Sequence, residues 1–92
     1  MKRVVITGAG TINSIGQDFS QTINSLREGR CGISSLKFKD VERLSIKIGG
    51  QIHDFEPERH FNRQQLSLYD RYTQLTLIAA DEAIAQSGLT FN

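Results

Sequence analysis

The chain contains no tryptophan, one proline and one cysteine among its 92 residues. A lone cysteine, Cys31, cannot form an internal disulfide, and no paired spacing typical of a zinc site is present. With 38% hydrophobic residues the composition is that of a globular chain rather than a disordered tail. We therefore expect a packed core and a reducing compartment.

Charge of one sign and long apolar runs are also scarce. Eleven Lys and Arg residues oppose ten Asp and Glu residues, so the net charge is +1 and no large field attracts nucleic acid or an anionic membrane. The apolar run at residues 4–6 is too short for a signal peptide or a membrane span. We expect no nucleic-acid partner, no membrane partner and a cytoplasmic location.

A strand is expected at residues 2–7, because its centre is a continuous β-branched run typical of a buried parallel strand. Gly8 and Gly10 end it. A structured loop then follows at residues 11–17, where Gly16 permits the last turn.

A first amphipathic helix is expected after Asp18, which is a suitable N-cap. Phe19, Ile23 and Leu26 share one stripe, and Gly29 stands where a left-handed C-cap is wanted. The pattern predicts a helix that packs on a sheet.

The middle of the chain has weaker periodicity. Residues 32–45 are interpreted as a wrapped loop, and residues 45–52 as an edge or hairpin strand. Pro57 can begin a short helix that reaches Phe61, and Asn62 with Gln65 resembles a capping box that starts another.

The longest helix is expected from Asp70, its N-cap, to about Gln86, with Gly88 ending it. Asp81 and Glu82 are interpreted as its solvent-facing side. The helix carries one apolar stripe and further apolar residues that widen it: Tyr72, Leu75, Ala79 and Ala83, then Leu77, Ile78 and Ile84. Two apolar helices need more covering surface than one strand and one edge strand supply, so we expect an incomplete α/β unit.

The strand and glycine turn also suggest a dinucleotide-binding site, but the spacing differs from the fingerprint. G-x-G-x-x-G requires glycine at position 13, where Asn13 stands, and the short-chain dehydrogenase variant requires small residues where Ile12 and Ser14 stand. The helix also begins too late to hold a phosphate closely. A Rossmann-type nucleotide-binding domain is therefore the third-ranked alternative.

Other reactive side chains give no site. Cys31 follows a helix C-terminus, whose dipole disfavours a thiolate, although Arg30 acts in the opposite direction. His53 and His60 have acidic neighbours but no third donor on a shared face. We predict no catalytic, cofactor-binding or metal-binding residue in this chain, and no cofactor.

Several segments, in order, are similar to one family: Lys2 to Gly10, Ser14-Ile15-Gly16, Leu26 to Ile33, Gly49 to Phe55, Tyr69 to Gln74, and Ala79 to Ala83 followed by Ser87-Gly88-Leu89. Together they resemble the N-terminal end of a β-ketoacyl-acyl carrier protein synthase of the elongating, synthase II-like type, in the thiolase-like superfamily. Each segment alone is a weak signal, but their order and spacing are fairly specific.

The resemblance implies that residues 1–92 are an incomplete portion of the synthase N-terminal domain, in a layered α-β-α-β-α fold. It implies a homodimeric acyltransferase of fatty acid or polyketide biosynthesis that loads an acyl group onto a cysteine and condenses it with malonyl-acyl carrier protein after decarboxylation. The family's nucleophile and two histidines lie downstream, so this segment alone is predicted inactive. Seven residues are expected to be structural: Gly8, Gly10, Gly16, Gly29, Gly32, Asp70 and Arg71.

Two points of the resemblance stay open. Relatives of the bacterial elongating type carry several basic residues across positions 62–68 that contact the carrier protein, whereas only Arg63 remains here. The segment also does not separate an active synthase from a non-catalytic, chain-length-factor-like partner subunit with the same scaffold.

Overall fold

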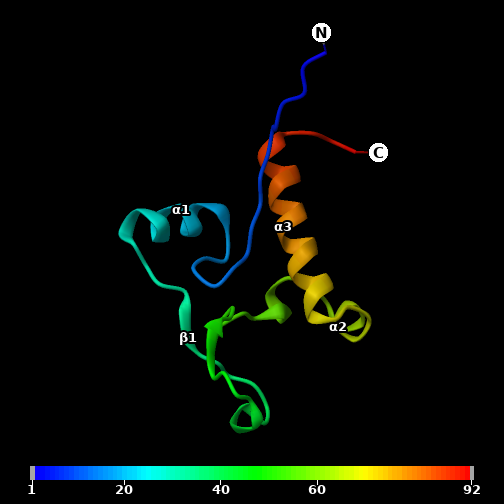
Figure 1. The fold of residues 1–92 in the computed structure, drawn as a ribbon. Coiled ribbons are helices and arrows are strands. Elements are labelled where there is room, and N and C mark those ends of the chain that lie inside the picture. Colours follow the sequence, from blue (N-terminus) through cyan, green and yellow to red (C-terminus); the bar gives the residue numbers. More distant parts are fainter. Residues whose placement is uncertain (1, 92) are drawn as a thin grey trace.

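The computed structural model describes residues 2–91; Met1 and Asn92, the ends of the expected domain, lie outside them. The elements in chain order are α1 (Phe19–Glu28), β1 (Ile33–Ser35), η1 (Val41–Arg43), β2 (Ile48–Gly50), η2 (Pro57–Arg59), α2 (Arg63–Leu68) and α3 (Arg71–Ser87). The two strands form one antiparallel ladder. Figure 1 shows α1 and α3 on opposite sides of the N-terminal segment, with the β1–β2 hairpin extending away from both helices.

The described chain is extended rather than closed around a core. Its radius of gyration is 16.3 Å, whereas a compact domain of this length has about 12 Å. Among residues 2–91, Phe55 is the one hydrophobic side chain classed as buried. The expected layered fold is incomplete within residues 2–91, because their sheet has two short antiparallel strands that provide no surface for helices to cover on two faces.

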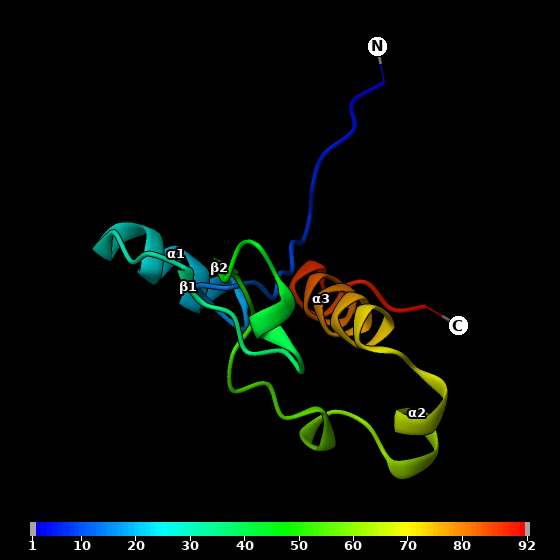
Figure 2. The same ribbon diagram turned by 60° about the horizontal axis from the view of Figure 1, so that its bottom comes forward.

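The helix α1 has the predicted boundaries. The Asp18 carboxylate accepts a hydrogen bond from the backbone N–H of Gln21, and Gly29 adopts the left-handed conformation at φ 70°. The prediction that its apolar stripe packs on a sheet is wrong for these residues. Leu26 is 63% exposed, because the sheet within the described residues has only two short strands. Figure 2 shows α1 and α3 apart from each other.

The strand predicted at residues 2–7 requires a correction. This segment pairs with no other strand within the described residues, and Val4 and Ile6 are 97% and 91% exposed instead of buried. A strand is stabilised by a neighbour's N–H and C=O groups, and the described chain offers none here.

The region interpreted as a wrapped loop at residues 32–45 contains β1 and η1. Strand β2 confirms the hairpin strand predicted at residues 45–52 but occupies only three of those positions. Ile33 lies opposite Gly50 and Ser35 opposite Ile48. The sequence signal for β1 is weak because its three residues are all exposed and show no alternation.

The C-terminal half agrees closely with the sequence. Asn62 and Gln65 form the predicted capping box at the start of α2. The helix α3 begins after Asp70 and ends at Gly88, which has φ 72°. The element at Pro57 is a single short turn, and Tyr72 is 77% exposed rather than part of a covered stripe.

Candidate functional site

The loop after the N-terminal segment crosses α3 at very short range. A Cβ atom added to Gly8 would overlap the carbonyl oxygen of Ala83, and one added to Gly10 would overlap that of Ala79. Both glycines therefore lie against the helix backbone with no room for a side chain. The sequence predicted structural roles for Gly8 and Gly10, and the small residues facing them are the alanines of its predicted inward stripe.

Two side chains of α3 bind the backbone of this crossing segment. Gln86 Oε1 accepts the N–H of Ala9 at 2.6 Å, and Glu82 Oε1 accepts the N–H of Thr11 at 3.0 Å. Glu82 Oε2 also accepts the N–H of Phe19, the first residue of α1, at 2.9 Å. The carboxylate thus lies at the positive end of the α1 dipole and joins three segments of the chain.

This contact corrects the interpretation of Glu82 as solvent-facing; the neighbouring Asp81 is exposed as expected. The sequence does hold a signal, because Glu82 and Gln86 are four residues apart and lie beside Ala79 and Ala83 on one helix face. The contact also opposes the dinucleotide alternative. Backbone N–H groups that such a site would direct at a pyrophosphate are bonded here to a carboxylate and an amide.

The turn before α1 is equally close-packed. Asn13 and Gly16 exchange two backbone hydrogen bonds, and a Cβ atom on Gly16 would lie 2.6 Å from the backbone nitrogen of Thr22. A Cβ atom on Gly32 would overlap the side chain of Ser14. Gly16 and Gly32, for which structural roles are predicted, thus lie where an added Cβ atom would meet neighbouring atoms.

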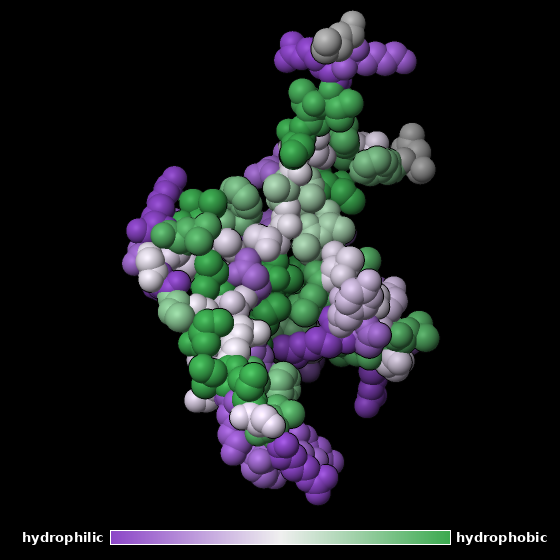
Figure 3. Space-filling model, viewed as in Figure 1, coloured by the Kyte–Doolittle hydropathy of each residue, from purple (hydrophilic) through white to green (hydrophobic). Residues whose placement is uncertain are grey.

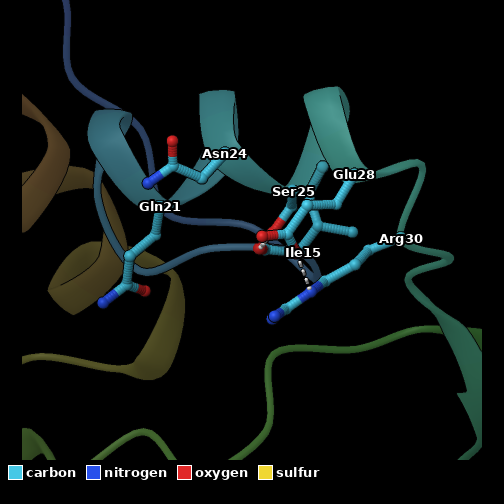
Figure 4. Close-up of a pocket in the computed structure, with 6 residues that line it drawn as sticks. All are labelled: Ile15, Gln21, Asn24, Ser25, Glu28 and Arg30. Carbon is cyan, nitrogen blue, oxygen red and sulfur yellow. Dashed lines mark hydrogen bonds and ion pairs between the residues drawn. The ribbon is translucent and has the colours of Figure 1, made fainter.

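An open pocket of about 450 Å³ lies between this turn and α1 (Figure 4). Its charged groups, Glu28 and Arg30, pair with each other at 2.8 Å, and Ser25 donates to the carbonyl of Ile15 at 2.6 Å. The charged groups and the Ser25 hydroxyl of the pocket wall are therefore used in internal contacts, and the wall presents no nucleophile with a base.

Arg71, which is predicted to be structural, lies over the buried residue Phe55. The guanidinium carbon is 5.0 Å from the ring centroid, and Nη2 donates to the carbonyl of Ile52 at 3.3 Å. His60 stacks on the same ring at 5.9 Å. Arg71 thus joins the start of α3 to the segment after β2 through a cation–π contact and a hydrogen bond.

Asp70 caps α3 by accepting the backbone N–H of Thr73 at 2.8 Å. This backbone hydrogen bond, with a smaller contribution from the Thr73 side chain, lowers the pKa of the Asp70 carboxyl from its ordinary value of 3.8; slight desolvation acts in the opposite direction. The charged form is therefore favoured at the helix N-terminus.

The remaining reactive side chains lie apart. Cys31 is exposed, with its sulfur 3.4 Å from the backbone nitrogen of Ile33. His53 Nε2 lies 2.9 Å from Ser34 Oγ, whereas His60 stacks on Phe55. Across residues 2–91 no three His, Cys, Asp or Glu residues converge as metal ligands, and no helix is both long and apolar enough to cross a membrane.

Comparison with known proteins identifies the chain's family. A family model described as the N-terminal domain of β-ketoacyl synthase matches residues 1–92. The chain belongs to the β-ketoacyl synthase family. The family resemblance of the ordered sequence segments is thereby confirmed.

Individual relatives agree with this family. The chain is 35% identical over 91 residues to 3-oxoacyl-[acyl-carrier-protein] synthase 2 of Staphylococcus aureus strain COL, covering 99% of this chain and 22% of that protein. It is 37% identical over 89 residues to nodulation protein E of Rhizobium sp. strain N33, covering 97% and 22%. The chain thus spans about a fifth of the length of these relatives.

A solved structure shows the fold. The ishigamide ketosynthase/chain length factor superposes with a TM-score of 0.83 at 35% identity, covering 97% of this chain and 22% of that one. The coarse prediction of a ketosynthase-type, thiolase-like segment is therefore confirmed, and the elements described above are the part of that fold which this chain contains.

Proposed function

We propose that the whole protein is a β-ketoacyl-acyl carrier protein synthase, and that residues 1–92 are an incomplete part of its N-terminal domain. The observation that carries this proposal is the match of the whole chain to the family and to a 3-oxoacyl-[acyl-carrier-protein] synthase. In this proposal an acyl group moves from a carrier thioester to a cysteine thiolate. Malonyl-acyl carrier protein then loses CO₂, and the resulting enolate attacks the acyl-cysteine carbonyl and releases the cysteine.

The segment's own part in this reaction is to support the site. Among residues 2–91 the reactive side chains do not form a nucleophile with a base and an oxyanion hole. Its contacts instead fix the loop at residues 8–18 between α1 and α3 through Glu82 and Gln86. We propose that this junction is scaffold for catalytic groups from later residues, that the protein is a homodimer, and that its carrier is an acyl carrier protein. A cytoplasmic location stays a prediction.

The test is a condensation assay on the full-length gene product. Purified protein is incubated with an acyl thioester of the carrier protein and with malonyl-acyl carrier protein, and the carrier is analysed by mass spectrometry. The proposal predicts a 3-oxoacyl product two carbons longer and release of CO₂, whereas residues 1–92 alone give neither. Absence of product from a protein that retains its downstream cysteine would contradict it.

A non-catalytic, chain-length-factor-like subunit is the second candidate. It is favoured by the superposed structure, whose name includes both a ketosynthase and a chain length factor. The residue at the downstream nucleophile position separates the two candidates. Glutamine or another inert side chain at that position favours the non-catalytic subunit. In that case the protein would form product only when it is mixed with an active synthase.

A further inference from the structure

The connection between β1 and β2, residues 36–47, concentrates positive charge. We call it the basic arm. It carries four cationic side chains, Lys37, Lys39, Arg43 and Lys47, against two acidic ones, Asp40 and Glu42. All six are exposed. The arm therefore has a formal charge of +2, whereas the entire chain has +1, so the remainder of the chain is slightly negative.

The cations of the arm are not used within the described structure. The ion pairs found among residues 2–91 are Arg30 with Glu28 and Arg59 with Glu56, and neither involves the arm. Positions 62–68, where relatives of the elongating type contact the carrier protein, hold fewer free cations than the arm. Arg63 is the sole cation of α2, and the preceding Arg59 is paired with Glu56.

The arm has a defined backbone that holds these charges in place. Leu36 donates to the carbonyl of Lys47 at 2.9 Å, which extends the β1–β2 pairing and brings the two ends of the arm together. The Gln51 side chain accepts the N–H of Lys37 at 2.8 Å and donates to its carbonyl at 3.1 Å. The turn η1 lies at the far end of the arm (Figure 1).

Apolar groups are exposed among the cations. Phe38 and Ile46 are 53% and 71% exposed, and Leu44 is partly exposed as well. Figure 3 shows strongly hydrophilic side chains gathered at the end of the hairpin with hydrophobic atoms directly beside them. Exposed aromatic residues and arginine are enriched in protein interfaces, and cations of either type increase the association rate with an acidic partner.

We propose that the basic arm is a docking surface for an acidic protein, the acyl carrier protein. The proposal rests on the proposed function, which supplies a carrier as the partner, and it locates the main electrostatic contact on the arm rather than on α2. Charge complementarity supports it, since the arm gathers four cations that form no ion pair within residues 2–91, whereas α2 carries one cation and the chain outside the arm is slightly negative.

The test measures the association rate of the full-length protein with holo acyl carrier protein by stopped-flow fluorescence at several salt concentrations. Lys39→Glu and Arg43→Glu are each expected to slow association by about three- to tenfold at low salt, and less at high salt. The matched control is Arg27→Glu, the same charge change at an exposed site on α1, which is expected to leave the rate within about twofold. Lys39→Gln and Arg43→Gln, which only neutralise charge, should give smaller losses, and circular dichroism verifies that each variant is folded.

Each result decides the proposal. Slower association of the arm variants with a normal Arg27→Glu rate supports it. The proposal is overturned if only Arg63→Glu slows association, or if Arg27→Glu slows association as much as the arm variants do. Equal weakening of binding to phosphatidylserine vesicles would show a general polyanion surface and also overturn it. If carrier binding is normal in all arm variants while the wild type condenses substrates, only this inference fails; if the wild type neither binds carrier nor condenses, the proposed function fails as well.

Discussion

The carboxylate of Glu82 on α3 accepts the backbone N–H of Phe19 at the start of α1, at 2.9 Å. The same carboxylate accepts the N–H of Thr11. Glu82 is more than sixty positions from both Phe19 and Thr11 in the sequence. The helices α1 and α3 share no other extensive contact in the described structure. Glu82 therefore links the start of α1 directly to α3.

Replacement of Glu82 by alanine should lower the free energy of unfolding of the whole protein by about 2 kcal/mol, because charge-assisted bonds to two backbone donors are lost. Glu82→Gln keeps an acceptor oxygen and should cost less. Urea denaturation measures both. The control is Asp81→Ala, which removes an exposed neighbouring carboxylate, and a similar loss in that variant would refute the role of Glu82.

Substitution of Gly10 by alanine should be strongly destabilising, by about 3 kcal/mol, since the new methyl group would overlap the carbonyl oxygen of Ala79 and force the loop away from α3. Gly50→Ala is the matched control, because its added Cβ atom would meet nothing nearer than Ser14 Oγ at 3.4 Å. The urea midpoints of the two variants are compared. Equal stability would mean that the loop does not cross the helix this closely.

The lowered pKa of Asp70 predicts a pH dependence of stability. Hydrogen bonds from Thr73 lower the pKa of its carboxyl below 3.8 in the folded state, so its contribution to stability is present above that value and is lost as pH falls through the folded pKa. The variant Asp70→Asn keeps a capping oxygen without this titration. The stability difference between wild type and Asp70→Asn should be constant above about pH 5 and shrink in stronger acid. If this stability difference grew on acidification, the pKa of Asp70 would not be lowered in the folded state.

The contact of Arg71 with Phe55 should appear as a coupling energy. Arg71→Lys removes the planar group that lies over the ring, and Phe55→Leu removes the ring while keeping an apolar side chain. A double-mutant cycle from urea denaturation is expected to give a coupling of about 0.5–1 kcal/mol. Strictly additive losses would show that Arg71 acts only through its hydrogen bond to Ile52.

The helices of this chain follow from local signals, whereas the rest of the structure depends on non-local pairing. Asp18, Asn62 and Asp70 each cap a helix where the sequence predicts one, because capping depends on residues three positions apart. The run at residues 4–6 has the composition of a buried strand, yet its burial depends on neighbours that residues 2–91 do not provide. The prediction for Glu82 is wrong for a related reason. Helical periodicity places Glu82 on one face with Gln86, but it does not identify the partners of Glu82, which lie in the loop at residues 8–18 and at the start of α1.

The exposed apolar side chains of Val4, Val5 and Ile6 are, in our interpretation, covered by other polypeptide in the full-length protein. Amide hydrogen exchange at Val4, Val5 and Ile6 provides the decisive comparison, in the full-length protein and in residues 1–92 alone. We expect protection of about a thousandfold or more in the full-length protein, where these amides join a sheet, and almost none in the isolated segment. Equal protection in both would show that no covering polypeptide is needed.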